Sequence, residues 1–132
     1  QKPAYLVNQL RAFRDGTREN GMMQNMAANL TDQEINNLAA YFASVKNVSA
    51  GGDSELATKG EPKASMCFGC HGNKASGMGV TPKLAGQQPA YLQRQLQAFK
   101  AGTRKNGPMR GISNMLSEEE VQAVTEYMGS LK

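Results

Sequence analysis

The sequence of 132 residues has no tryptophan, one histidine and only two cysteines. It contains no apolar run near the roughly 20 residues that a membrane-spanning helix needs. Hydrophobic residues make up 39% of the chain, which is little for a self-sufficient core and predicts that a bound group supplies apolar mass. No basic and then apolar leader opens the sequence, so we expect a chain that has already been processed.

The two cysteines and the histidine lie together in Cys67-Phe68-Gly69-Cys70-His71. This spacing is typical of covalent haem c attachment, because cysteines separated by two residues can form thioethers with both vinyl groups of one porphyrin. The next residue then offers its imidazole to the iron. The motif predicts Cys67 and Cys70 as haem attachment residues and His71 as an axial iron ligand.

Three other uses of a CxxC pair account for the sequence less well. A structural zinc site needs four cysteine or histidine ligands, and this chain has three. A thioredoxin-like redox pair begins a helix after a strand, and no alternating β-branched pattern precedes Cys67. A structural disulfide would leave His71 without a role.

The net charge of +4 does not indicate a nucleic-acid partner, because basic and acidic residues are interspersed and no stripe of aromatic and basic residues occurs. Several basic residues nevertheless concentrate in the half that carries the motif. They form either a solvated face or a docking rim for an acidic redox partner. These residues are Lys83, Arg94, Lys100, Arg104, Lys105 and Arg110.

An internal repeat divides the chain. Residues 3–21 match residues 89–107 at 13 of 19 positions with a constant offset of 86. The register continues without a gap, so that Met23 aligns with Met109. Each copy is therefore predicted to contain the same two helices joined by the same loop.

Both helices of each copy have sequence signals. The first is predicted over residues 3–16 and 89–102, because a proline suits the first turn, apolar residues recur at helical spacing and a glycine marks the end. A capping box, serine or threonine followed three residues later by glutamate, opens the second. The second helix is predicted over residues 31–46 and 117–132.

The remaining segments complete an all-α prediction without a convincing strand. Residues 48–53, rich in glycine and serine, are predicted to be a linker. A further helix is predicted over about Ser54–Cys67, although Gly60 and Pro62 weaken its pattern. Residues 107–111 are predicted to be irregular.

With a single histidine in the chain, the sixth iron ligand must be a methionine, a lysine, water or nothing. Methionine is a soft ligand that stabilises ferrous iron, which suits an electron carrier. Met109 is the best candidate, because it lies in the segment predicted to be irregular and the repeat retains Met23 at the same position. Met115 is a weaker alternative, because it aligns with Asn29 in the repeat. Met78 lies too close to the motif in sequence to reach the opposite face of the haem easily.

The segments CFGCHGN, TPKLAGQQPAYLQRQLQAFKAGTRKNG and PMRGISNMLSEEEV resemble the cytochrome c4 family, whose members carry two haems in tandem class I cytochrome c domains. The resemblance covers nearly the whole chain. It implies that Met109 is the axial methionine and that Met23 is its equivalent in a second site. It also implies that the carbonyl of Pro82 holds the His71 ring, unless Pro82 only shapes its loop.

The resemblance also implies the domain organisation and the haem pocket. Residues 1–48 would form the C-terminal helical half of a first cytochrome c domain, and residues 49–132 a complete haem-bearing domain. The first copy has no CxxCH motif: either the chain is part of a longer one, or the copy is a half-domain without haem, or another chain completes it by swapping. We favour the first explanation. The expected pocket residues are Tyr91, Leu96, Phe99 and Arg104, of which Arg104 either reaches a haem propionate or lies on the surface.

The implied activity is one-electron transfer, not catalysis. By resemblance, the donor would be a quinol-oxidising complex and the acceptor a haem-copper terminal oxidase. The alternative is the haem subunit of a dehydrogenase complex that oxidises sulfur compounds. An enzyme or sensor with an open iron site is a third class, which Met109 argues against. Because bacteria attach haem c outside the cytoplasmic membrane, we expect a periplasmic location, free or membrane-associated.

Overall fold

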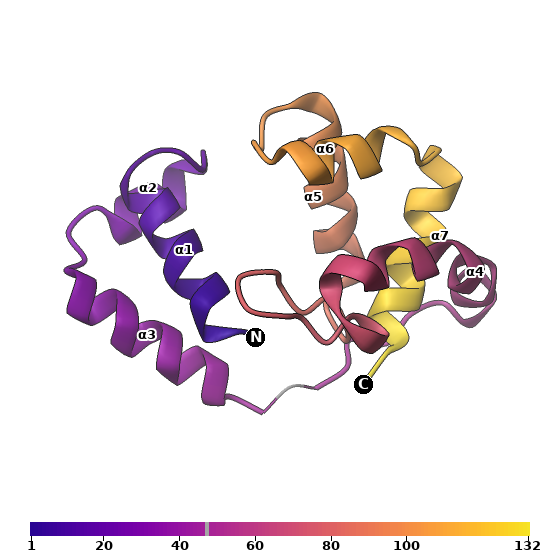
Figure 1. The fold of residues 1–132 in the computed structure, drawn as a ribbon, viewed down its shortest axis with the longest axis horizontal. Coiled ribbons are helices and arrows are strands. Elements are labelled where there is room, and N and C mark those ends of the chain that lie inside the picture. The colour runs from indigo at the N-terminus through magenta and orange to yellow at the C-terminus, as the bar shows by residue number, and fades with distance from the viewer. Residues whose placement is uncertain (47) are drawn as a thin grey trace.

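The computed structural model describes residues 1–46 and 48–132. Figure 1 shows two groups of helices joined by the segment after α3. The first group consists of α1 (Pro3–Arg14), α2 (Gly21–Ala27) and α3 (Asp32–Ser44). The second consists of α4 (Ser54–His71), the short 3₁₀ helix η1 (Asn73–Ala75), α5 (Pro89–Ala101), α6 (Gly107–Asn114) and α7 (Glu118–Ser130). The described residues form no strand, and the all-α fold class is confirmed.

The repeat appears as three matched helix pairs: α1 with α5, α2 with α6, and α3 with α7. Both predicted capping boxes are present. The Thr31 side chain accepts from the Glu34 N–H while the Glu34 carboxylate accepts from the Thr31 N–H, and Ser117 and Glu120 repeat the pair. Both capped helices end two residues before the predicted ends, because the backbone turns extended after Ser44 and Ser130.

The prediction of two helices per copy is wrong, because α2 and α6 lie where a loop was expected. Pro108 falls in the first turn of α6, where its missing N–H removes no helical hydrogen bond. The Asn106 side chain caps the helix by accepting from the Met109 N–H at 3.0 Å. Asn20 caps α2 through the Met23 N–H in the same way. An asparagine before each segment was the N-cap signal that sequence reasoning missed.

Helix α4 forms as predicted but continues four residues past the predicted end, through His71. Pro62 lies inside it, and packing against α7 offsets the lost hydrogen bond. Gly60 allows this packing, since a Cβ at residue 60 would lie 2.1 Å from the Ala123 carbonyl oxygen. The CxxCH motif therefore belongs to the last turns of a helix.

Residues 48–53 contain no helix, as expected for a linker. They lie against α7 and form hydrogen bonds with it. The Ser49 hydroxyl donates to the Gly129 carbonyl at 2.7 Å, and the Asp53 N–H donates to the Glu126 carboxylate at 2.9 Å. None of the described helices combines the length and the hydropathy of a membrane span.

The hydrophobic core of the second half adjoins the motif. Its buried members are Ala64, Ala75, Leu92, Val124 and Met128. Half-buried side chains that include Cys67, Phe68, Leu84 and Tyr91 pack against this cluster. The core of the second half thus adjoins Cys67, one of the two predicted attachment residues, whereas Cys70 is exposed.

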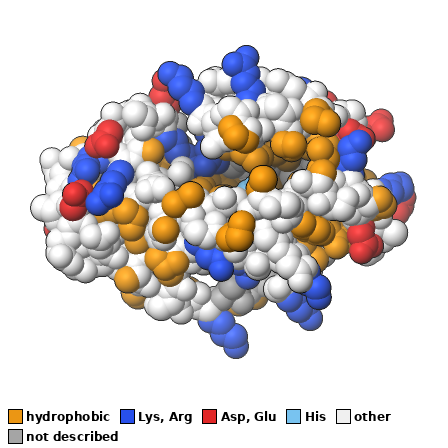
Figure 2. Space-filling model, in the orientation of Figure 1, with side chains coloured by type: hydrophobic (Ala, Val, Ile, Leu, Met, Phe, Trp, Pro, Cys, Tyr) orange, Lys and Arg blue, Asp and Glu red, His pale blue; other side chains and the backbone are white. Residues whose placement is uncertain are grey.

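Helix α3 differs from its repeat partner α7 in how it is covered. Met128 of α7 is 1% exposed, whereas its counterpart Phe42 in α3 is 52% exposed, and its neighbour Tyr41 is 64% exposed. Helix α7 packs on α4, and no helix of the described part covers α3 in this way. Figure 2 shows hydrophobic side chains exposed on both halves of one face, with Lys and Arg side chains projecting from its edges.

Candidate haem site

The end of α4 brings the three motif residues together. Cys67, Cys70 and His71 stand at helical positions i, i+3 and i+4, which share one face of a helix. Both cysteines are free thiols, so the pair forms no disulfide in the structure. Burial raises the pKa of the Cys67 thiol, with a smaller contribution from nearby Cys70. Because neither sulfur is held in a disulfide, both cysteines are available for thioether formation.

His71 is buried and has a fixed orientation. His71 is only 5% exposed, and its Nδ1 lies 2.8 Å from the Pro82 carbonyl oxygen. Burial lowers the pKa of His71, and the hydrogen bond to Pro82 opposes part of this shift. A neutral ring that donates through Nδ1 keeps its lone pair on Nε2, which is the form that ligates a metal.

Met109 is the third residue of α6 and is half-buried. Its backbone is held at both ends: its N–H donates to Asn106, and its carbonyl accepts from the Ser113 hydroxyl at 2.7 Å. The two alternative methionines are far more exposed, Met115 at 66% and Met78 at 60%. Among these three candidates, only Met109 combines partial burial with a rigid backbone.

Helix α5 carries the expected pocket wall. Phe99 is buried, and Tyr91 and Leu96 are half-buried. Helix α5 contacts both α6, which carries Met109, and α7, which packs on α4. Sequence reasoning missed Phe68 and Leu84, which pack on the same core. The sequence signal for both was their position, because Phe68 lies between the cysteines and Leu84 lies two residues after Pro82.

Arg104 lies between the two halves of the molecule. Its guanidinium stacks 4.6 Å from the centre of the Phe99 ring and donates to the Tyr5 hydroxyl at 3.0 Å. It also donates to the side-chain oxygens of Gln9 and Gln95. Its partners thus belong to both copies of the repeat.

Arg18, the repeat counterpart of Arg104, makes the reciprocal contacts. It stacks on Phe13 at 4.6 Å and donates to the Tyr91 hydroxyl at 3.2 Å and to Gln95 at 3.0 Å. The same surface of each half therefore binds the other, as in an interface with two-fold symmetry. A cavity of about 420 Å³ opens here, lined by both arginines and by Met23.

The donor set fits a haem c. Two free thiols and a neutral, oriented imidazole are the protein groups that this prosthetic group requires. The part of the chain that the structure describes contains no group of three or more His, Cys, Asp or Glu residues able to hold another metal ion.

Comparison with known proteins decides the family. A model of the Cytochrome c family matches residues 57–132. A cytochrome c4 of Thiocapsa roseopersicina is 39% identical over 147 residues, covering 99% of this chain and 76% of that protein. The chain belongs to the cytochrome c4 family. Family membership means that it binds haem c covalently and carries electrons, since cytochrome c4 proteins are electron carriers and not enzymes.

Two further relatives extend the cytochrome c4 comparison. The solved structure of cytochrome c4 from Acidithiobacillus ferrooxidans has a TM-score of 0.90 and 31% identity, covering 98% of this chain and 85% of that one. A thiosulfate dehydrogenase electron acceptor of Stutzerimonas stutzeri is 40% identical over 96% of this chain, which spans 66% of that protein's length.

The reciprocal interface should show energetic coupling between each arginine and the tyrosine of the other half. A double-mutant cycle with Arg18→Ala and Tyr91→Phe should give a coupling energy of about 1 kcal/mol, because a hydrogen bond to a charged donor is lost. The cycle of Arg104→Ala with Tyr5→Phe should give a similar value. Urea unfolding of the haem-loaded protein measures both.

The crossed cycle of Arg18→Ala with Tyr5→Phe is the matched control, because the structure shows no bond between these residues. It should give a clearly smaller coupling than either direct cycle, because Arg18 and Tyr5 are linked only indirectly, through Gln9 and Arg104. A crossed coupling as large as the two direct ones would contradict the exchanged arrangement.

Proposed function

We propose that this cytochrome carries single electrons in the bacterial periplasm through a haem attached at Cys67 and Cys70 and ligated by His71 and Met109. The observation that carries the proposal is the buried His71 ring, oriented by the Pro82 carbonyl at the end of the attachment helix. The bound haem supplies the one-electron redox chemistry.

The protein groups around this site support a carrier that rearranges little. The Pro82 bond keeps His71 in one tautomer, and the Asn106 and Ser113 bonds fix the backbone of Met109. Half-buried Tyr91 and Leu96 would form the α5 side of the haem pocket. A site held in this way has few groups to reposition when the iron charge changes.

We propose a quinol-oxidising complex as donor and a haem-copper terminal oxidase as acceptor. A thiosulfate-oxidising dehydrogenase is the second candidate donor, because a relative with 40% identity is a thiosulfate dehydrogenase electron acceptor. The cytochrome subunit of a sulfide dehydrogenase from Chlorobaculum tepidum also matches 56% of the chain. Either donor would deliver electrons to the same haem.

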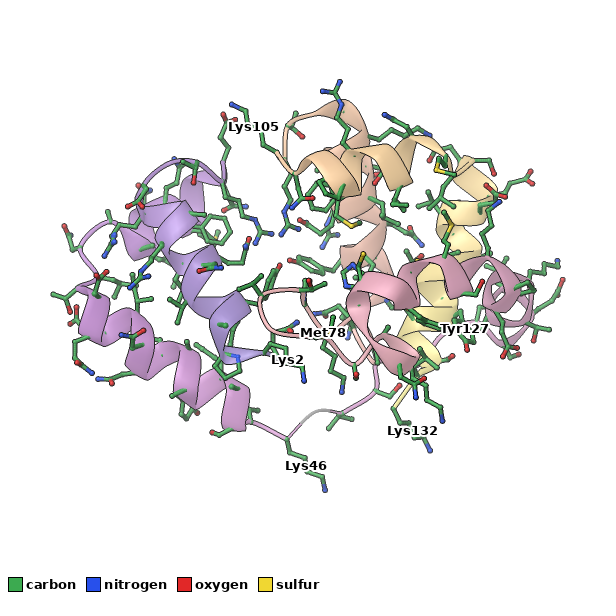
Figure 3. The ribbon with its side chains drawn as sticks, in the orientation of Figure 1. Lys2, Lys46, Met78, Lys105, Tyr127 and Lys132 are labelled. Carbon is green, nitrogen blue, oxygen red and sulfur yellow. The ribbon has the colours of Figure 1, made fainter. Side chains whose placement is uncertain are left out.

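The basic residues of the second half fall into two groups, those with partners inside the molecule and those that are exposed. Lys100 pairs with Glu118, and Arg104 is engaged in the interface. Arg94, Lys105 and Arg110 are exposed, and Figure 3 shows Lys105 projecting at the side that faces the first half. These three residues support a docking rim for an acidic partner, whose association should weaken with salt.

We also propose that Met23 is the axial ligand of a second haem. Met23 has the same capped position in α2 as Met109 has in α6. The exposed face of α3 around Phe42 corresponds to the face of α7 that packs on α4. The occupant we infer is a helix equivalent to α4, with its own CxxCH motif, outside these 132 residues.

Replacement of the proposed methionine ligand tests the haem site. Met109→Leu should open the sixth iron position, so that the reduced protein binds carbon monoxide within the mixing time, whereas the native protein should not. Visible absorption spectroscopy after rapid mixing measures the binding. Met115→Leu is the matched control and should behave as the native protein does, because Met115 is exposed. Rapid binding by the native protein would overturn the six-coordinate assignment.

Reduction kinetics distinguish the proposed donors. A quinol-oxidising complex should reduce the cytochrome in stopped-flow experiments, at a rate that falls as ionic strength rises. Purified thiosulfate dehydrogenase with thiosulfate is the competing donor. If only the dehydrogenase reduces it at a comparable rate, the second candidate replaces the first. An Arg94→Gln variant should slow the reaction with the true donor at low salt.

A haem count tests the role of Met23. The protein isolated from its natural host should show two covalent haems by intact mass and pyridine haemochrome assay. A single haem in that protein would refute the second site without affecting the site at His71.

A further inference from the structure

Gln1, next to the start of α1, contacts the loop that orients the haem ligand of the second half. The side-chain Nε2 of Gln1 donates to the Lys83 carbonyl at 2.9 Å, and the Lys83 N–H donates to the Gln1 side-chain oxygen at 2.8 Å. Both bonds are partly buried. The amide of Gln1 thus pairs with this backbone much as a neighbouring strand would.

The neighbouring residue packs on the same loop. A Cβ on Gly77 would lie 3.0 Å from carbons of the Lys2 side chain and 2.5 Å from the Lys83 backbone nitrogen. Figure 3 shows Lys2 beside the part of the loop that carries Met78, and Figure 1 shows the N-terminus at the same place. The beginning of the first half and the loop after α4 are therefore in close contact.

Gln1 and His71 bind opposite ends of one peptide group. The carbonyl oxygen of Pro82 and the N–H of Lys83 belong to the same peptide unit. The oxygen accepts from His71 Nδ1 at 2.8 Å, and the N–H donates to Gln1 at 2.8 Å. Hydrogen bonds in such a chain polarise one another, so donation to Gln1 makes the Pro82 oxygen a stronger acceptor.

We propose that Gln1 is a positioning residue that lowers the reduction potential of the haem bound by His71. A stronger hydrogen bond at Nδ1 makes the imidazole a more basic ligand, and a more basic ligand stabilises ferric over ferrous iron. The first half of the chain thereby adjusts the haem of the second half. The proposal rests on the ligation of His71 stated under the proposed function.

The repeat supplies a matched control residue. Gln87 is the counterpart of Gln1 at the offset of 86. Each glutamine accepts a bond from the N–H of the next residue, at 2.8 Å in Gln1 and 2.9 Å in Gln87. Only Gln1 also pairs with Lys83. Substitutions at Gln87 therefore reproduce the chemical change without the effect on the loop.

The experiment compares Gln1→Ala and Gln1→Glu in the haem-loaded full chain by spectroelectrochemistry. Gln1→Ala should raise the midpoint potential, because the Lys83 N–H loses its acceptor. Gln1→Glu removes the donor to the Lys83 carbonyl but offers the Lys83 N–H a carboxylate, which is a stronger acceptor than an amide, and should lower the potential. Gln87→Ala and Gln87→Glu should leave the potential of this haem nearly unchanged. Measurements at high salt remove the long-range effect of the added charge, and intact mass verifies that Gln1 retains its amide.

The NMR shift of the His71 Nδ1–H in the reduced protein provides a second readout. It should move in opposite directions in the two Gln1 variants, together with the potential. Variants that shift the potential in the same direction, or that leave the Nδ1–H resonance in place, would overturn the proposal and indicate only a looser loop. Failure of the proposed function would look different, since the native haem would then not cycle reversibly or would not be ligated by His71.

Discussion

At Gly60 the backbones of α4 and α7 meet, and a side chain there would collide with the Ala123 carbonyl. This contact determines the position of the rest of the haem-bearing half. It places the end of α4, with both cysteines and His71, beside the buried core that includes Leu92 and Met128. Because α6 leads directly into α7, the same contact also constrains the helix that carries Met109.

The features that could be predicted from sequence are local ones. Cys67, Cys70 and His71 are adjacent in sequence, and each capping box spans four residues, so their chemistry can be read without the fold. Helix α6 lies where residues 107–111 were predicted to be irregular. A first-turn proline after a capping asparagine favours a helix, although proline disfavours a helix interior. Whether proline permits a helix thus depends on its position in that helix, and not on the residue type alone.

The contacts between the halves could not be predicted from the repeat. Arg18 bonds Gln9 of its own copy and Tyr91 and Gln95 of the other, and these residue types occur in both copies. A repeated sequence is equally compatible with bonds inside one copy and bonds across copies. Only the packing of the two helical groups distinguishes them. The pairing of Gln1 with Lys83 spans 82 residues and carries no local signal.

The reciprocal interface links the evolution of the two copies. Gln9 accepts from Arg18 of its own half and from Arg104 of the other, and Gln95 is shared in the same manner. A substitution in one copy therefore disturbs contacts made by both. Gene duplication usually frees one copy to diverge, but here each copy is the binding partner of the other. The segment that retains 13 identical residues of 19 includes all of these contacts, so the surface where the two copies meet is built from residues that both copies share.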